Sequence, residues 1–251
     1  ASVAAYAARA GIKAHVFAPT SAPKPKLDQI AVYGAQLHTI EGPRDLSTSA
    51  AMLFVQEHDL VYASHNRSPF FIEGVKQFAH EVMEQMADHV PDHLVIPVGN
   101  GSLFMGAYKG FEELVMRGKL PRIPKLHAVQ TKAVMPLVAA FNKQPWSKDQ
   151  ASPTLAGGIA VTDPPHIHRL VSILRETDGQ AVAVRDDEIL YSQRLLAEQQ
   201  GIFAEPTSAA ALAGLQILVS DGLIDRTDTI LVPITGSGLK DAPPSRRPDQ
   251  T

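Results

Sequence analysis

The nine residues LVIPVGNGS, at positions 94–102, decide the fold. The apolar run LVIPV is followed at once by a glycine-rich turn, and residues 104–116 after the turn are predicted to be a helix. A continuous apolar run bounded by turn residues is typical of a strand that is buried on both faces. The stretch therefore predicts a strand, a tight turn and a helix in succession, which is the unit of a parallel sheet.

The same alternation continues on both sides of this stretch. Further strands are predicted at residues 14–18, 36–40, 60–63, 126–130, 181–184 and 229–234. Helices are predicted at residues 24–33, 45–58, 71–86, 104–116, 166–176, 189–200 and 207–219. Because the strands are continuous apolar runs, we expect an α/β fold of parallel sheets covered by helices on both faces.

The pattern predicts two such three-layer units. The smaller α/β unit covers residues 1–65, and the larger unit, which carries the candidate site, covers residues 66–241. The segment 64–69 is the predicted hinge between them. Residues 242–251 are rich in proline and charge and predict a disordered tail.

Composition excludes several classes of protein. An apolar fraction of 45% excludes disorder as the main state, and a net charge of −3 argues against a nucleic-acid surface. Without cysteine there is no disulfide, thiolate zinc site or cysteine nucleophile. No apolar run approaches the ~20 residues of a membrane span, and no basic signal-peptide start is visible. We therefore expect no membrane or nucleic-acid partner and a cytoplasmic location.

The start of the sequence, ASVAAYAARAG, predicts a helix that ends at Gly11. No methionine precedes this helix, and no strand leads into it. Either the N-terminus has been trimmed or a further N-terminal segment belongs to the protein. We expect the second.

Residues 99–103, GNGSL, are the first candidate site. Glycines allow a sharp turn, and backbone N–H groups at a helix N-terminus favour an anion such as phosphate. The motif is neither a dinucleotide fingerprint nor a Walker A loop, because position 104 is Phe and position 107 is Ala. The alternative is an ordinary turn between a strand and a helix.

Two later motifs also lie next to predicted strands or helices. TGSGLKD, residues 235–241, follows the last strand and could reach a ligand or simply lead to the tail. In EPTSA, residues 205–209, Thr207 or Ser208 can cap the helix, and Glu205 could be a site carboxylate. We predict no metal site, because neither His89 and His93 nor His166 and His168 have a catalytic zinc spacing.

Taken together, six segments resemble the fold type II pyridoxal-phosphate enzymes, the tryptophan synthase beta-like group that includes threonine synthase. In chain order the segments are ASVAAYAARAGI, SPFFIEGVKQ, PVGNGSL with AYKGFEEL, TLAGGIAV, AEPTSAAALAGL and ITGSGLKD. They cover nearly the whole chain.

The resemblance assigns roles toward pyridoxal 5′-phosphate. Backbone amides of residues 99–103 would hold the phosphate, and the Thr235 hydroxyl would bind the pyridine nitrogen. The turn at Gly158 would lie near the ring, and Ser237 belongs to the terminal motif. The cofactor-binding residues implied are therefore Gly99, Asn100, Gly101, Ser102, Leu103, Gly158, Thr235 and Ser237.

The sequence also departs from the family pattern. The family has a serine–glycine–asparagine motif before the first helix and a Schiff-base lysine further upstream, and neither occurs here. Lys240 matches a position in the terminal motif, so no catalytic residue is predicted within this chain. Threonine synthases usually carry an arginine at the position of Phe71, which contacts the substrate phosphate, and Arg67 is the nearest replacement.

The resemblance implies a carbon–oxygen lyase that works on a small amino acid by β- or γ-elimination or replacement. Formation of threonine from O-phosphohomoserine is the first candidate reaction. A threonine or serine dehydratase-like deaminase is the alternative, as is a non-catalytic relative that binds an anion or a partner. A homodimer is the expected assembly.

Overall fold

The computed structural model describes residues 1–22, 24–42, 44–65, 68–86 and 90–240. Its chain divides into two compact units, Ala1–Ser68 and Pro69–Thr251. The predicted tail, Arg67 and His89 lie outside the described residues.

Unit 1 is built around a sheet of two parallel strands. Its elements are α1 (Ser2–Arg9), β1 (His15–Pro19), α2 (Lys24–Val32), β2 (Gln36–Ile40) and α3 (Arg44–His58). Helix α3 covers the sheet through a stack of rings, in which Phe54 lies 4.7 Å from His15 and 4.1 Å from His58 between centroids. The strand predicted at residues 60–63 is wrong, because this segment has no strand pairing and Val61 is 91% exposed.

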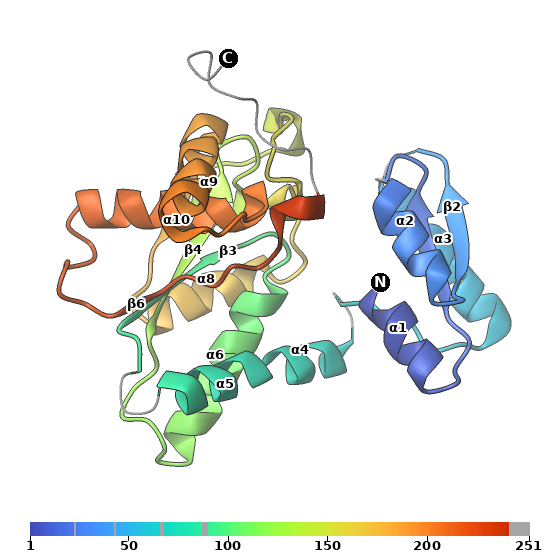
Figure 1. Ribbon diagram of the computed structural model, residues 1–251, viewed down its shortest axis with the longest axis horizontal. Coiled ribbons are helices and arrows are strands. Elements are labelled where there is room, and N and C mark those ends of the chain that lie inside the picture. Colours follow the sequence, from blue (N-terminus) through green and yellow to red (C-terminus); the bar gives the residue numbers. More distant parts are fainter. Residues whose placement is uncertain (23, 43, 66–67, 87–89, 241–251) are drawn as a thin grey trace. The chain divides into compact units, whose positions relative to one another are not determined.

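Unit 2 contains a sheet of four parallel strands (Figure 1). Their order across the sheet is β5 (Ala181–Val184), β4 (Lys125–Thr131), β3 (His93–Pro97) and β6 (Ile230–Leu231). The parallel sheet is confirmed, although β6 pairs over two residues where six were predicted.

Helices cover both faces of this sheet. Because successive strand residues point to opposite sides, neighbouring residues of β3 lie in different cores. Leu94 and Ile96 pack into one core with α5 (Gln77–Met86), α6 (Ser102–Met116), α7 (Pro136–Phe141) and α8 (Ile167–Glu176). Val95 packs into a second core with α9 (Asp186–Gln200) and α10 (Pro206–Ser220). The predicted three-layer α/β fold is therefore confirmed for unit 2 (Figure 1).

The single helix predicted at residues 71–86 is two helices, α4 (Pro69–Val75) and α5, which are separated at Lys76. Gly106 and Gly110 of α6 are four residues apart and lie on the same face of that helix. A Cβ at Gly106 would come within 2.6 Å of Val75, and one at Gly110 would strike the Lys76 carbonyl oxygen. These glycines let α6 approach the junction of α4 and α5 closely.

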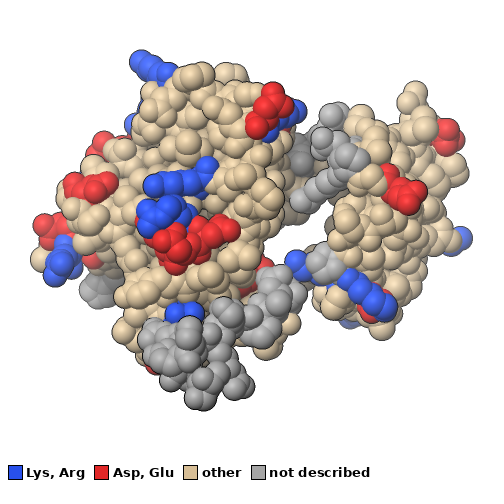
Figure 2. Space-filling view, turned by 90° about the horizontal axis from the view of Figure 1, so that it is seen from above, with Lys and Arg blue, Asp and Glu red and all other residues tan. Residues whose placement is uncertain are grey.

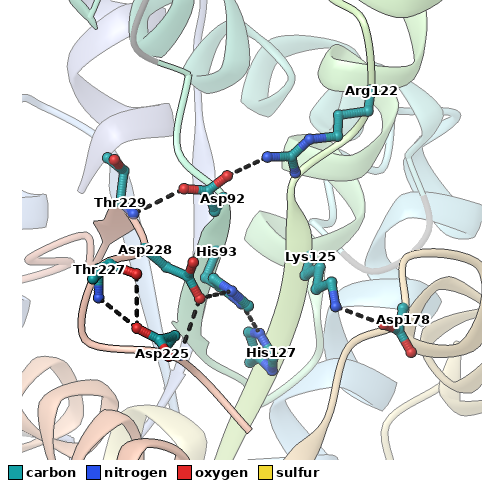
Figure 3. A network of polar contacts seen from close by, with 10 residues as sticks. All are labelled: Asp92, His93, Arg122, Lys125, His127, Asp178, Asp225, Thr227, Asp228 and Thr229. Atoms are coloured by element: carbon teal, nitrogen blue, oxygen red, sulfur yellow. Dashed lines mark hydrogen bonds and ion pairs between the residues drawn. The ribbon is translucent and has the colours of Figure 1, made fainter.

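A chain of hydrogen bonds ties the strands together at their N-terminal ends, and Figure 3 shows its links from His127 to His93 and from His93 to Asp228. The Gln180 amide donates to Nδ1 of His127 (3.2 Å), Nε2 of His127 lies 2.8 Å from Nδ1 of His93, and Nε2 of His93 lies 3.0 Å from the Asp228 carboxylate. Because an amide can only donate, His127 Nδ1 accepts, and each ring then donates through Nε2. Both rings are therefore neutral in this arrangement.

Candidate functional site

The candidate site lies at the opposite edge of the sheet, where β3 and β6 end. The two strands are parallel neighbours, with His93 opposite Ile230 and Leu94 opposite Leu231. Residues that follow them therefore leave the sheet at the same edge, which is where open α/β sheets bind ligands. The two loops concerned are residues 98–101 and residues 232–238.

The turn after β3 presents the N-terminus of α6. Gly101 has φ +84°, in the left-handed region that glycine adopts without strain, and precedes the first helical residue, Ser102. The first intrahelical bond runs from Met105 N to the Gly101 carbonyl. The amides of Ser102, Leu103 and Phe104 come before that bond, so they have no acceptor within the helix and suit an anion.

The glycines of this turn are needed for packing against the protein itself. A Cβ at Gly99 would come 2.9 Å from the Gly158 carbonyl oxygen. A Cβ at Gly101 would come 2.5 Å from Cδ2 of Leu170, a core residue of α8. The cradle at residues 99–103 is thus pressed against the turn at Gly158 on one side and the core on the other.

The turn at Gly158 is held by α9 and α10. The Gly158 amide donates to Oγ1 of Thr207 at 3.1 Å. Just upstream, the Asp186 carboxylate accepts from the Thr154 hydroxyl at 2.6 Å and from the Leu155 amide at 2.9 Å. Residues 154–158 are therefore anchored at both ends.

The loop after β6 is held by Ser208, the residue that follows Thr207. Ser208 is fully buried, and its Oγ lies 2.8 Å from Oγ1 of Thr235 and accepts from the Gly236 amide at 2.8 Å. The Gly236 carbonyl accepts from the Glu205 amide at 3.0 Å. Helix capping by Thr207 or Ser208 is wrong, because the N-cap is Glu205 and neither hydroxyl caps the helix.

The structure thus connects three segments with predicted site residues through a continuous series of contacts in which Thr207 and Ser208 are the links. Gly99 packs on Gly158, Gly158 binds Thr207, and the adjacent Ser208 binds Thr235. Thr235 is exposed, and Ser237 Oγ accepts from the Leu239 amide at 3.3 Å within its own loop. Sequence reasoning missed the structural role of Thr207 and Ser208, whose local pattern resembles an ordinary helix start.

The three segments of the site carry no positively charged side chain of their own. Residues 98–104, 157–159 and 235–238 contain no lysine or arginine. Figure 2 shows acidic and basic side chains next to each other on the described part of one face of the molecule. Within these segments, the groups that suit a phosphate are therefore backbone amides.

Within the described residues, no helix has the length and apolarity needed to cross a membrane.

Comparison with known proteins identifies the chain. A family model described as pyridoxal-phosphate dependent enzyme matches residues 1–236. Threonine synthase of Methanocaldococcus jannaschii is 36% identical over 246 residues, which are 96% of this chain and 60% of that protein. Threonine synthase of Methanosarcina acetivorans is 34% identical over 244 residues, with the same two shares. The chain thus spans about 60% of the length of these relatives.

Solved structures agree on the fold. Serine racemase from Dictyostelium discoideum superposes with a TM-score of 0.75 at 22% identity, covering 94% of this chain and 72% of that one. Threonine deaminase isoform 2 from Solanum lycopersicum gives 0.77 at 20% identity, covering 94% and 65%. The predicted resemblance and the fold type II architecture are confirmed. The chain belongs to the family of pyridoxal-phosphate-dependent enzymes.

Proposed function

We propose that the protein containing this chain is a pyridoxal-phosphate-dependent lyase acting on a small amino acid by β- or γ-elimination or replacement. The observation that carries the proposal is that the α6 N-terminus and the Thr235 loop meet at one sheet edge in a chain of this family. The residues present fit a phosphorylated pyridine. The cradle offers amides to a phosphate, and Thr235 offers a neutral hydroxyl to a ring nitrogen.

Each segment has a distinct task in this proposal. The amides of residues 99–103 bind the phosphate, and Thr235 binds the ring nitrogen. Gly158 lies beside the ring, and Ser237 belongs to the same terminal loop as Thr235. The bound cofactor supplies an electron sink for negative charge at the substrate α-carbon. We place no catalytic lysine within residues 1–251.

Two substrates are distinguished by Phe71. The similarity to threonine synthases supports O-phosphohomoserine, whereas the side chain at position 71 argues against a phosphorylated substrate. Phe71, in α4, is 39% exposed and cannot pair with a phosphate dianion, which favours a hydroxy amino acid and a dehydratase-like deamination. Assays of the full-length protein should therefore show 2-oxobutyrate formed from threonine faster than phosphate released from O-phosphohomoserine. Faster phosphate release would support threonine synthesis, and neither activity would favour a non-catalytic relative.

The cradle itself is tested at Ser102, which is half-buried at the first position of α6. Ser102→Asp places a carboxylate where the helix dipole favours it, by about 0.3–1 kcal/mol, so the fold should be retained. The same carboxylate would repel a bound phosphate. We expect the affinity for pyridoxine 5′-phosphate, measured by titration calorimetry, to fall at least about tenfold, or 1.4 kcal/mol.

Ser102→Asn is the matched control for this experiment. It is similar in size to aspartate, has no charge and should bind nearly as well as the wild type. Equal affinities of the aspartate and asparagine variants would refute the phosphate cradle. Gly101 is unsuitable for such a test, because a side chain there would strike Leu170 and disturb the core.

The amino-acid substrate remains the expected small-molecule partner. The homodimer and the cytoplasmic location stay predictions. Light scattering of the purified full-length protein measures its assembly directly.

A further inference from the structure

The last strand of unit 2 has a short backbone pairing. β6 pairs with β3 over two residues, whereas strands in globular proteins commonly have about 5–6. The chain that follows β6 carries Thr235 and Gly236 to the candidate site, where Ser208 holds them. Segments with few backbone pairs open most easily, so the contacts at the start of β6 matter for where this strand lies.

Asp92 holds the start of β6 through both its side chain and its backbone (Figure 3). Thr229 is the residue just before β6, and its amide donates to the Asp92 carboxylate at 2.9 Å. The Thr229 carbonyl accepts from the Asp92 amide at 2.8 Å. Beside this pair, Nε2 of the buried His93 lies 3.0 Å from the Asp228 carboxylate. Both backbone groups of Thr229 are therefore bound by Asp92.

Asp92 is in turn fixed to the middle of the sheet. It directly precedes β3, and its carbonyl accepts from the amide of Lys125, the first residue of β4, at 2.9 Å. Its carboxylate uses Oδ2 for the Thr229 amide and Oδ1 for an ion pair with the Arg122 guanidinium. A carboxylate accepts at both oxygens, so these two contacts do not compete. Asp92 therefore ties Thr229 to β3 and β4, the two inner strands of the sheet.

We propose that Asp92 is a positioning residue for the candidate site, because it sets where Thr235 lies at the opposite edge of the sheet. An extended chain rises about 3.3 Å per residue, so the segment from Thr229 to Thr235 spans at most about 20 Å. Asp92 holds one end of this segment and Ser208 holds the other. Without the first contact the segment can shift or open, and the Thr235 hydroxyl is then less firmly placed. This inference concerns the loop itself and goes beyond the function proposed above.

Amide hydrogen exchange of the full-length protein without ligand tests the proposal. Mass spectrometry of peptides that cover residues 232–240 follows the Gly236 amide, which donates to Ser208. We expect Asp92→Ala to speed exchange in these peptides at least about tenfold, the worth of one hydrogen bond to a charged group. Peptides from α6, residues 102–116, should exchange as in the wild type, because the opening is local to β6 and the loop after it.

Three further variants separate the Thr229 contact from the charge of Asp92. Asp92→Asn keeps an acceptor for the Thr229 amide and should exchange like the wild type. Arg122→Gln is the matched control, because it removes the same ion pair and leaves the Thr229 contact in place, so it should not affect residues 232–240. Asp92→Glu keeps the charge but moves the carboxylate by one methylene. It supplies the test if Asp92→Ala does not fold, and it should still speed the exchange.

Binding of pyridoxine 5′-phosphate gives a second readout, which rests on the proposed function. We expect Asp92→Ala to weaken this binding about tenfold and Asp92→Asn to retain it. If the wild type does not bind this probe, the proposed function fails, and the exchange measurement alone decides the inference. Unchanged exchange in residues 232–240 of Asp92→Ala and Asp92→Glu would overturn the inference. Equal acceleration in α6, or unchanged affinity of Asp92→Ala for a probe that the wild type binds, would overturn it as well.

Discussion

Replacing Gly110 by alanine should lower the free energy of unfolding by about 2–3 kcal/mol, although alanine favours a helix by about 1 kcal/mol over glycine. A Cβ at this position would strike the backbone carbonyl of Lys76 and come 2.6 Å from the Cβ of Ala79. A carbonyl oxygen in a packed junction cannot rotate away as a side chain does. Helix α6 would have to move away from α4 and α5, with a loss of packing in the core that α5 and α6 share.

Gly74→Ala provides the comparison. Gly74 also lies in a helix, α4, but nothing is within 4 Å of an added Cβ, so stability should rise by up to about 1 kcal/mol. Urea unfolding followed by the fluorescence of Trp146, the single tryptophan, reports on unit 2. Stabilisation by both substitutions would show that the close approach of α6 is absent in solution.

Unit 2 should also lose about 3 kcal/mol of stability as the pH falls from 6.5 to 4. The pKa of His127 is lowered from 6.5 to about 4. Burial is the largest cause, and the neighbouring His93 and Lys125 add to it. The unfolded chain then binds a proton in a range where the folded chain does not. Stability is complete above pH 6.5, declines down to pH 4, and is not reduced further by this residue below that value.

The hydrogen-bond chain gives the geometric reason for this loss. A proton on Nδ1 of His127 would face the Gln180 amide, which is itself a donor. His127→Gln removes the titrating group and should flatten the pH profile between 6.5 and 4, even if its stability is lower overall. Carboxylates with lowered pKa values, such as Asp92 and Glu176, lose their contribution only below about pH 4.5, so the slope between pH 6.5 and 4.5 belongs to His127. An unchanged slope in the glutamine variant would contradict the assignment to His127.

The strands of unit 2 could be predicted because a strand that is buried on both faces has a local sequence pattern, a continuous apolar run. The same pattern led to a wrong strand prediction at residues 60–63. An apolar run favours burial, but a strand also needs a neighbouring strand with free backbone N–H and C=O groups. The break at Lys76 was equally invisible. In the structure, α6 packs closely against this break, and the two glycines that permit the approach lie 30 residues or more away in the sequence.

For the candidate site, local sequence predicted the loops but not what holds them. Glycines after an apolar strand indicate a turn and an open helix N-terminus, so the loops at residues 99–103 and 235–238 could be expected. Thr207 and Ser208 have the pattern of a helix cap, and only the three-dimensional structure shows that their hydroxyls bind Gly158 and Thr235. A side chain that supports a distant loop leaves no periodic or compositional signal.

The pairing of β6 with β3 has a consequence for the order of folding. The paired residues His93 and Ile230 are 137 positions apart, so the Thr235 loop reaches the α6 N-terminus only after a very long chain segment has closed. Closing such long-range contacts is slow compared with forming helices. On the ribosome, the loop after β6 cannot join the α6 N-terminus until β6 has emerged. If the proposed function holds, retention of a phosphopyridine ligand would therefore report that β6 has paired with β3.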